Sequence, residues 1–233
     1  MHMMKADVMV DIHARNNHIA EHVHEHLAEH KIFAVNIMGA PGAGKTTLVK
    51  ELQKKYANAV AVSVDLIQES LYDTLGFASP DERRKLKAAA FKIALDEALD
   101  YTEQGLVPLL EYPFCDRHKE MLNSALKNKN ILNLRLDLPL EEAYRRFHER
   151  DLSGKRHPGH YFQSYPPKDG DKPAYQIFED YQSAMHRTHT PEFEMGRTLK
   201  IDATHFPLPM DKICAFIDSS DTLKPNSRTS DGR

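Results

Sequence analysis

The chain has 233 residues, of which 41% are hydrophobic and 28% charged, a balance typical of a soluble globular protein with room for one α/β domain. A formal net charge of -3 gives no support to a general nucleic-acid binder, and no apolar run approaches the roughly 20 residues that cross a bilayer. Cys115 and Cys214 are far apart, and the N-terminus lacks the apolar stretch of a signal peptide, so we expect a cytoplasmic protein without nucleic-acid or membrane partners.

Residues 1–30 are expected to form a histidine-rich unit with a polar helix over residues 12–30. An apolar stripe recurs every four residues, at Ile19, Val23 and Leu27. Four histidines share that spacing and therefore one helix face: His18, His22, His26 and His30. Imidazoles four residues apart can bind Zn²⁺ or Ni²⁺. The alternative, which we favour, is a solvated polar face with adventitious metal binding.

Residues 31–218 alternate short apolar runs with helical stretches. The runs predict five strands, at residues 32–37, 59–64, 107–111, 131–136 and 199–203. The first helical stretch begins near Lys45, and five more cover residues 80–104, 116–127, 140–150, 174–185 and 209–217. The start of the second is marked by Ser79 as cap, Pro80 at the first helical position and Glu82 as partner in a capping box, and Gly105 marks its end.

This alternation predicts crossover connections and a five-stranded parallel sheet covered on both faces, a three-layer α/β/α architecture. Ligands of such sheets bind at the carboxyl ends of the strands, an edge expected to carry Gly39, Asp65, Glu111 and Thr204. Residues 151–173, rich in Gly, Pro, His and Lys, are expected to be exposed and mobile. The polar residues 219–233 predict a disordered tail.

The turn after the first strand matches the phosphate-binding pattern G-x-x-x-x-G-K-[ST]. Its glycines let successive backbone N–H groups point at phosphate oxygens, and the next helix adds the positive end of its dipole. The lysine reaches the β and γ phosphates and the threonine hydroxyl ligates Mg²⁺. The sequence thus predicts a P-loop NTPase fold in which the nucleotide contacts are Gly39, Ala40, Pro41, Gly42, Ala43, Gly44, Lys45, Thr46 and Thr47.

The signature that reads guanine in P-loop GTPases is missing. The nearest candidate for Asn-Lys-x-Asp is Asn128-Lys129-Asn130, which precedes a strand and lacks the aspartate. The position of the Asp-x-x-Gly motif reads Leu110-Glu111-Tyr112-Pro113. We therefore expect ATP as the nucleotide.

The segment Asp65-Leu66-Ile67-Gln68-Glu69 resembles the strand–Asp element of the zeta-toxin-like and chloramphenicol-phosphotransferase-like P-loop small-molecule kinases. In those families the aspartate lies beside the acceptor hydroxyl and acts as base or orienting group. The resemblance also covers the third strand, where Glu111 replaces the usual aspartate and is implied as a ligand of the Mg²⁺ site or an acceptor contact. It extends over about residues 31–218.

Two further stretches carry the same resemblance. Arg145 to Arg150, with the following Lys155-Arg156-His157-Pro158-Gly159-His160, is similar to the arginine-bearing lid of these kinases, here about residues 145–173. Arg146 and Arg150 lie four residues apart and are expected to point together. Ile201-Asp202-Ala203-Thr204 resembles the last strand of these kinases, whose following loop usually packs on adenine.

The leading hypothesis is an ATP-dependent phosphotransferase acting on a hydroxyl or phosphate of a small molecule. The expected catalytic residues are Lys45, Asp65, Arg146 and Arg150; Arg156 and Thr204 bind the nucleotide, and Thr46 and Glu111 hold Mg²⁺. Structural alternatives stay open: Asp65 as a helix cap, the arginines as ion pairs with nearby glutamates, and Glu111 as a buried structural acid.

The acceptor cannot be read from the sequence, and its candidate contacts are Phe77, Tyr112, Phe114, Arg117 and His118. Two other functional classes compete with a kinase. One is a nucleotide-hydrolysing nickel or zinc chaperone, because Arg15 to Lys45 resembles the start of the nickel-insertion GTPases. The other is an ATP-binding protein without kinase activity.

Overall fold

The structure is a computed structural model that describes residues 32–112, 118–125, 130–154, 156–174, 177–188 and 196–219. The predicted histidine-rich helix of residues 1–30 and the predicted tail from residue 220 onward lie outside these ranges. So do two of the candidate acceptor contacts, Phe114 and Arg117.

A five-stranded parallel sheet forms the centre of the domain, with the strand order β2-β3-β1-β4-β5. The strands are β1 (Ile32–Met38), β2 (Ala59–Ser63), β3 (Val107–Glu111), β4 (Asn130–Asp137) and β5 (Arg197–Asp202). The central strands β1 and β3 are nearly continuous buried runs because both faces of the sheet are covered there, whereas the edge strand β5 is mostly exposed. The α/β/α P-loop NTPase fold predicted from the sequence is confirmed.

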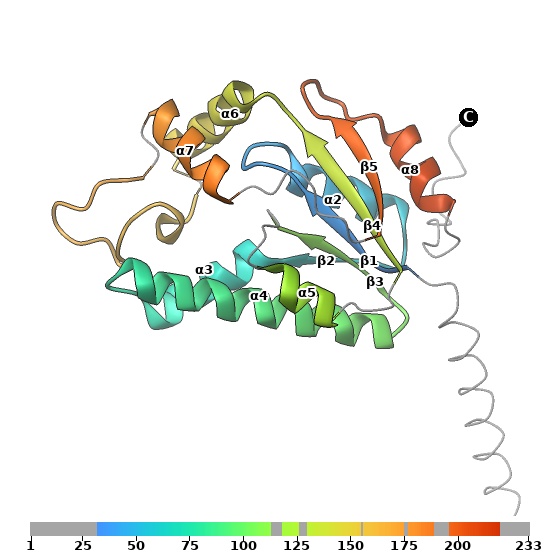
Figure 1. The fold of residues 1–233 in the computed structure, drawn as a ribbon, viewed down its shortest axis with the longest axis horizontal. Coiled ribbons are helices and arrows are strands. Elements are labelled where there is room, and N and C mark those ends of the chain that lie inside the picture. Colours follow the sequence, from blue (N-terminus) through green and yellow to red (C-terminus); the bar gives the residue numbers. More distant parts are fainter. Residues whose placement is uncertain are drawn as a thin grey trace, which may run out of the picture.

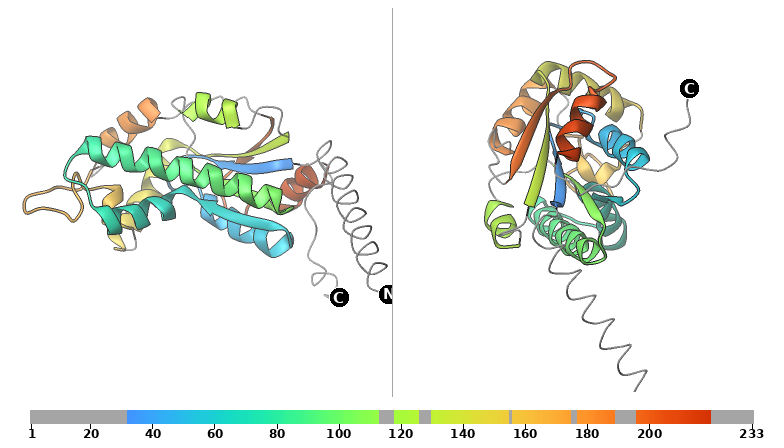
Figure 2. Two further views of the ribbon diagram at one scale, coloured as in Figure 1. Left: turned by 90° about the horizontal axis from the view of Figure 1, so that it is seen from below. Right: turned by 90° about the vertical axis from the view of Figure 1, so that its right-hand side faces the viewer.

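Helices cover the two faces of the sheet and its carboxyl edge (Figures 1 and 2). On one face α2 (Lys45–Lys55) and α8 (Met210–Asp218) bury aliphatic side chains such as Leu48, Leu52 and Ile213. On the other lie α3 (Val64–Leu75), α4 (Pro80–Glu103) and α5 (Lys119–Ala125). At the carboxyl edge, α6 (Leu140–Leu152) packs on α7 (Phe178–Thr188) through Phe147 and Tyr181.

A row of polar side chains crosses the sheet interior. Asn36 on β1 pairs in register with Asn133 on β4, which pairs with Thr198 on β5. The Asn36 amide donates to the Asn133 carbonyl oxygen at 3.0 Å, and Asn133 donates to the Thr198 hydroxyl at 3.2 Å. Both asparagines are fully buried, and these bonds replace part of the water that the amides lose on folding, because the Asn36 side-chain oxygen accepts no hydrogen bond from the described residues.

The segment between α6 and α7 differs from the prediction. Residues 156–174, called the lid segment below, include the short 3₁₀ helix η2 (Pro158–His160) and dock on α3. His160 and Ser164 are buried there, so the expectation of an exposed segment over residues 151–173 is wrong around these two residues, whereas residues 166–170 are exposed. The start predicted for α7, at residue 174, is also wrong, because the Ala174 N–H donates to the Tyr161 carbonyl and ties this residue to the lid segment.

Local signals placed other boundaries well. The Ser79 hydroxyl accepts from the Glu82 N–H at the start of α4, and Gly105 follows its end with a φ of 78°. The Glu82 carboxylate accepts from the Ala78 N–H, one residue before the partner expected in a capping box. In the part of the chain that the structure describes, no helix is long and apolar enough to cross a membrane.

Candidate active site

The phosphate loop follows β1 and is tightly enclosed. Gly42 and Gly44 both have a φ of 91°, a conformation that favours glycine. A Cβ atom on Gly42 would lie 2.5 Å from the Ala143 carbonyl oxygen of α6, and one on Gly44 would lie 2.6 Å from the Phe206 ring. The loop can therefore lie this close to α6 and Phe206 only because these positions lack side chains.

Lys45 begins α2 and its side chain is buried over the loop. Its Nζ donates to the carbonyl oxygens of Gly39 at 3.0 Å and Ala40 at 3.2 Å. Burial lowers the pKa of the ammonium group below its usual range, while the nearby carboxylates of Glu111 and Asp65 act in the opposite direction. A partly desolvated cation in this position is suited to binding phosphate oxygens.

Thr46 and Glu111 bring two oxygen donors together at the edge of the sheet. The Thr46 hydroxyl donates to the Glu111 carboxylate at 2.6 Å. Glu111 is the last residue of β3, the strand beside β1. Hydroxyl and carboxylate oxygens are ligands that Mg²⁺ prefers, so this pair fits a magnesium ion held next to the phosphates.

Asp65 lies in the first turn of α3, two residues after β2 ends at Ser63. The cap of α3 is Ser63, whose hydroxyl accepts from the Leu66 N–H at 3.4 Å. The alternative interpretation of Asp65 as the helix cap is therefore wrong. Its carboxylate instead lines the cavity described next.

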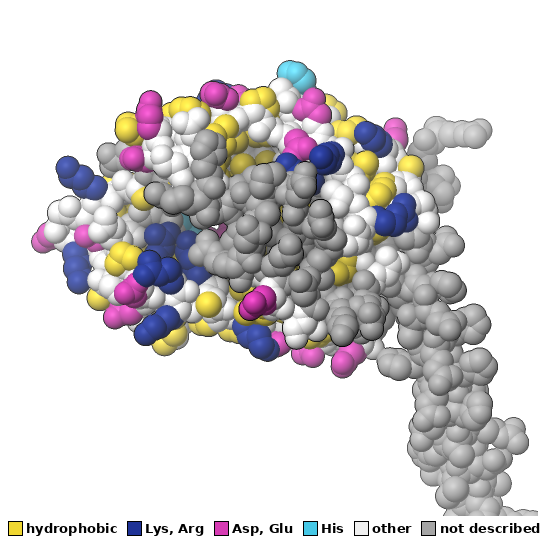
Figure 3. Space-filling view, viewed as in Figure 1, with side chains coloured by type: hydrophobic (Ala, Val, Ile, Leu, Met, Phe, Trp, Pro, Cys, Tyr) yellow, Lys and Arg dark blue, Asp and Glu magenta, His cyan; other side chains and the backbone are white. Residues whose placement is uncertain are grey.

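A cavity of about 510 Å³ lies between the phosphate loop, α3, α6 and the lid segment. Lys and Arg side chains gather on the side of the molecule where the lid segment faces α3 (Figure 3). The residues predicted from sequence that line it are Ala40, Pro41, Gly42, Gly44, Lys45, Thr46, Thr47, Asp65, Glu111, Tyr112, Arg146, Arg150 and Arg156. Its other lining residues include Gln68, Lys87, Phe147, His160, Tyr181 and Met185.

The three arginines of α6 have different surroundings. Arg145 pairs with Glu142 and Glu149 on the surface, as the ion-pair alternative expected. Arg146 donates to the carbonyl oxygens of Ala203 and Thr204 at 2.9 and 2.6 Å and to the Glu142 carboxylate at 2.7 Å. Arg150 lines the cavity, and its charge is felt by Lys45. Arg146 is thus hydrogen-bonded to the loop after β5. The charge of Arg150, in contrast, contributes to lowering the pKa of the phosphate-binding Lys45.

Arg156 extends from the lid segment toward α6. Its guanidinium pairs with Asp151 at 3.3 Å and lies over the Phe147 ring, 4.4 Å from the centroid. Burial lowers the pKa of the guanidinium, although a guanidinium remains charged at physiological pH. The lid segment therefore places a fixed positive charge at the cavity wall.

The loop after β5 contributes an aromatic side chain that the sequence analysis missed. Phe206 is 48% exposed, lies against Gly44, and has the Arg146 guanidinium 5.0 Å from its ring centroid. Thr204 takes part through its backbone: its carbonyl accepts from Arg146 and its N–H donates to Asp202 at 2.9 Å. The available signal was an aromatic residue in the loop that follows the last strand.

Among the candidate acceptor contacts, Tyr112 lines the cavity, whereas Phe77 and His118 do not. Phe77 packs on Tyr72 with ring centroids 5.0 Å apart, and His118 packs on Phe91 at 4.3 Å. Both are therefore core residues. In the described ranges, no group of three or more His, Cys, Asp or Glu side chains could hold a metal ion.

Comparisons with known proteins agree with this architecture. A family model described as an AAA domain matches residues 35–160. The chain resembles the crystal structure of a proposed kinase from Chloroflexus aurantiacus J-10-fl, with a TM-score of 0.65 and 22% identity over 82% of this chain and 99% of that one. A gluconokinase from Sinorhizobium meliloti 1021 gives a TM-score of 0.46 and 13% identity over 82% and 96%. Curated proteins give no match. The first likeness shows a shared fold.

Proposed function

The chain belongs to this AAA domain family, and from that premise we propose that it is an ATP-dependent phosphotransferase acting on a hydroxyl or phosphate of a small molecule. One observation carries the proposal. The phosphate-loop Lys45, the carboxylates of Asp65 and Glu111, and the guanidinium groups of Arg150 and Arg156 all line one cavity. Phosphoryl transfer needs this combination of positioning and positive charge rather than covalent help from the protein.

The donor half of the site comprises the phosphate loop and its neighbours. The loop N–H groups and Lys45 bind the β and γ phosphates. Thr46 and Glu111 would hold Mg²⁺, which would neutralise charge on the phosphate oxygens. Phe206, which lies against Gly44 and has the Arg146 guanidinium over its ring, offers an aromatic surface for the adenine ring.

The acceptor half centres on Asp65. A carboxylate beside the acceptor hydroxyl orients it and accepts its proton as the new P–O bond forms. Arg150 and Arg156 lie on the α6 and lid sides of the cavity and stabilise the negative charge on the moving phosphoryl group. The docked lid segment keeps water away from this reaction, which favours transfer over hydrolysis.

The test is ADP release from ATP with a panel of sugars, sugar acids, nucleosides and nucleotides as acceptors. We expect at least one acceptor to stimulate ADP release, and the Asp65→Asn variant to lower the stimulated rate by about 10²–10⁴-fold. Asp96→Asn, which removes a surface carboxylate of α4, is the control and should behave like the parent protein. Stimulation that persists unchanged in Asp65→Asn would refute the role of Asp65.

ADP release, together with nucleotide-binding and metal-binding titrations, separates this proposal from its two rivals. ATP affinity without turnover under any acceptor would indicate a non-catalytic binding protein. A nickel or zinc chaperone would bind metal stoichiometrically, lose that binding in His22→Ala/His26→Ala, and prefer GTP. The histidines concerned lie outside the described residues.

A further inference from the structure

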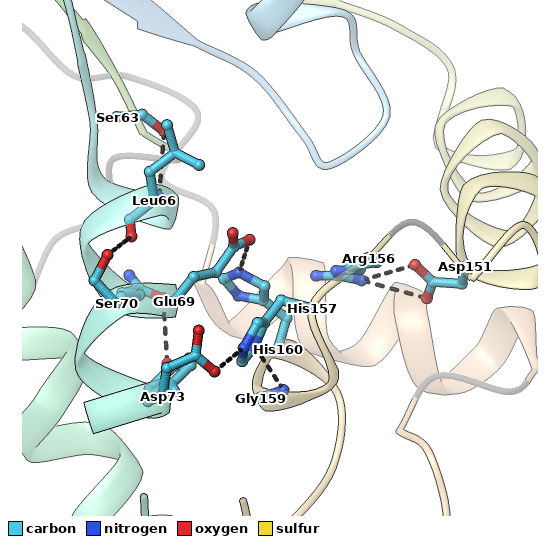
Figure 4. Close-up of polar contacts among 12 residues, drawn as sticks. Ser63, Leu66, Glu69, Ser70, Asp73, Asp151, Arg156, His157, Gly159 and His160 are labelled. Carbon is cyan, nitrogen blue, oxygen red and sulfur yellow. Dashed lines mark hydrogen bonds and ion pairs between the residues drawn. The ribbon is translucent and has the colours of Figure 1, made fainter. Parts of the chain in front are cut away.

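Two histidines of the lid segment bind carboxylates of α3 (Figure 4). His157 Nε2 lies 2.9 Å from Asp73 Oδ1, and His160 Nε2 lies 2.9 Å from Glu69 Oε1. Asp73 and Glu69 are one helical turn apart, so the two pairs repeat the same contact along α3. Both histidines therefore join the lid segment to α3 in the same way.

They differ in what their second ring nitrogen does. His157 Nδ1 accepts from the Gly159 N–H at 3.1 Å, so both of its nitrogens are used, and His157 does not line the cavity. His160 is only 7% exposed and does line the cavity. Its Nδ1 makes no hydrogen bond with any residue that the structure describes. This nitrogen is not sealed inside the protein, and because His160 lines the cavity a ligand there can bind it.

The orientation of the His160 ring is fixed by its neighbours. The Glu69 carboxylate accepts a hydrogen bond, so Nε2 carries a proton, and in the tautomer with one ring proton Nδ1 is left as an acceptor. Arg83 of α4 donates to the His160 carbonyl oxygen. Tyr72 packs edge-on against the imidazole, with centroids 5.9 Å apart, and Gly159 lies directly on the Tyr72 ring. The imidazole is therefore held in one position, as a binding residue requires.

The first turns of α3 place more hydrogen-bonding groups beside it. Asp65 and Gln68 line the same cavity, and Glu69 follows Gln68 directly. Gln68 is 2% exposed, and its side-chain oxygen accepts from the Tyr72 hydroxyl at 3.3 Å. This leaves the Gln68 amide NH₂ as a donor for a ligand. Carboxylate, amide and imidazole together can bind several hydroxyl groups of one molecule.

We propose that His160 is an acceptor-binding residue whose Nδ1 accepts a hydrogen bond from a second hydroxyl of a polyhydroxylated substrate. This inference rests on the proposed function, in which Asp65 receives the reacting hydroxyl. The acceptor pocket is then completed by the lid segment, and the substrate is a compound with neighbouring hydroxyl groups, such as a sugar or sugar acid.

Three variants test this, with steady-state kinetics on the best acceptor from the panel. In His160→Asn the amide occupies the place of Nδ1 and can keep the acceptor contact, whereas in His160→Gln it reaches the place of Nε2 and keeps only the Glu69 contact. We expect His160→Gln to raise the KM for the acceptor about tenfold, which is the effect of losing one hydrogen bond. In His160→Asn the KM for the acceptor should stay within about threefold of the parent value. The KM for ATP should stay within about twofold in both. His157→Gln, the matched control, should leave both constants unchanged.

A deoxy analogue of the acceptor, lacking the hydroxyl next to the phosphorylated one, gives a second readout. For the parent protein, kcat/KM should be about tenfold lower with the analogue than with the full acceptor. For His160→Gln the two values should be similar, because this variant has already lost the hydrogen bond to that hydroxyl. Equal effects of His160→Gln, His160→Asn and His157→Gln would overturn the inference and leave the kinase proposal intact. If no acceptor stimulates ADP release from the parent protein, the proposed function fails and this inference fails with it.

Discussion

The Thr46 hydroxyl donates a hydrogen bond of 2.6 Å to the Glu111 carboxylate, although the two residues are 65 positions apart in the chain. Thr46 stands at the start of α2 and Glu111 at the end of β3, and the parallel pairing of β1 with β3 brings them together. The fold therefore brings the glutamate at the end of β3 to the threonine of the phosphate loop.

Replacing Glu111 by Gln should weaken magnesium binding, because an amide oxygen carries no net charge to attract the cation. We expect the Mg²⁺ concentration for half-maximal ADP release to rise about tenfold or more, with nucleotide affinity in the absence of Mg²⁺ unchanged. A magnesium titration of turnover measures the first, and calorimetry in EDTA the second. Glu120→Gln, on the exposed surface of α5, is the control. An unchanged magnesium dependence would show that Glu111 is only structural.

Gly42→Ala should destabilise the protein and abolish nucleotide binding. The new Cβ would lie 2.5 Å from the Ala143 carbonyl oxygen, so α6 or the loop must move. Gly105 offers a matched control, since its φ of 78° is also positive but nothing lies within 4 Å of its Cβ position. Gly105→Ala therefore reports the backbone strain alone, about 1–2 kcal/mol. Thermal unfolding should show a larger loss for Gly42→Ala, and equal losses would contradict the tight packing of the loop.

Phe206→Ala should weaken ATP binding and spare the acceptor. Removing an aromatic surface from the edge of the phosphate loop costs about 0.5–1.5 kcal/mol, so the KM for ATP should rise about 2–12-fold. Ile93→Ala on α4, another exposed apolar side chain, should change nothing. Nucleotide affinity measured by calorimetry is the check, and a KM for ATP equal to that of the parent would exclude stacking on this ring.

The ion pairs of Glu142 should make the free energy of unfolding depend on pH in the acidic range. Hydrogen bonds from Arg145 and Arg146 lower its pKa to about 2 from its usual 4.5. Because the folded-state pKa is lowered, these contacts stabilise the protein above pH 4.5 and are lost as the pH falls toward 2. In urea unfolding across this range, the parent should lose stability relative to Glu142→Gln. A difference between the two that is independent of pH would contradict the ion pairs.

Short apolar runs were enough to predict all five strands: the central strands are nearly continuous apolar runs, and in the edge strand β5 the apolar residues Leu199 and Ile201 alternate with polar ones. Helix ends that depend on neighbouring residues were predicted equally well, as at Ser79 and Gly105. The order of the strands was not predicted, since it depends on which crossover lies on which face. The start of α7 was missed because one tertiary hydrogen bond, from Ala174 to Tyr161, holds the preceding residues in the lid segment.

The candidate site divides in the same way. The phosphate loop is contiguous in sequence, so its pattern alone located Lys45 and Thr46. His160 and Gln68 come together only because the lid segment docks on α3 through contacts up to 92 residues apart in sequence, and no local pattern encodes that distance. Phe206 likewise acquires its place over Gly44 from the packing of the loop after β5 on α6.

The buried row of Asn36, Asn133 and Thr198 also determines how β1 can align with its neighbours. If β1 slid by one residue, the Asn36 amide would turn toward the aliphatic side chains of α2 and α8 and lose its partner, at a cost of about 1–3 kcal/mol. Gly39 directly follows β1, so the same slip would carry the phosphate loop along the sheet edge, away from Glu111. The side chains of Asn36 and Asn133, which do not contact the ligand, thereby determine the position of the phosphate loop relative to the Glu111 carboxylate.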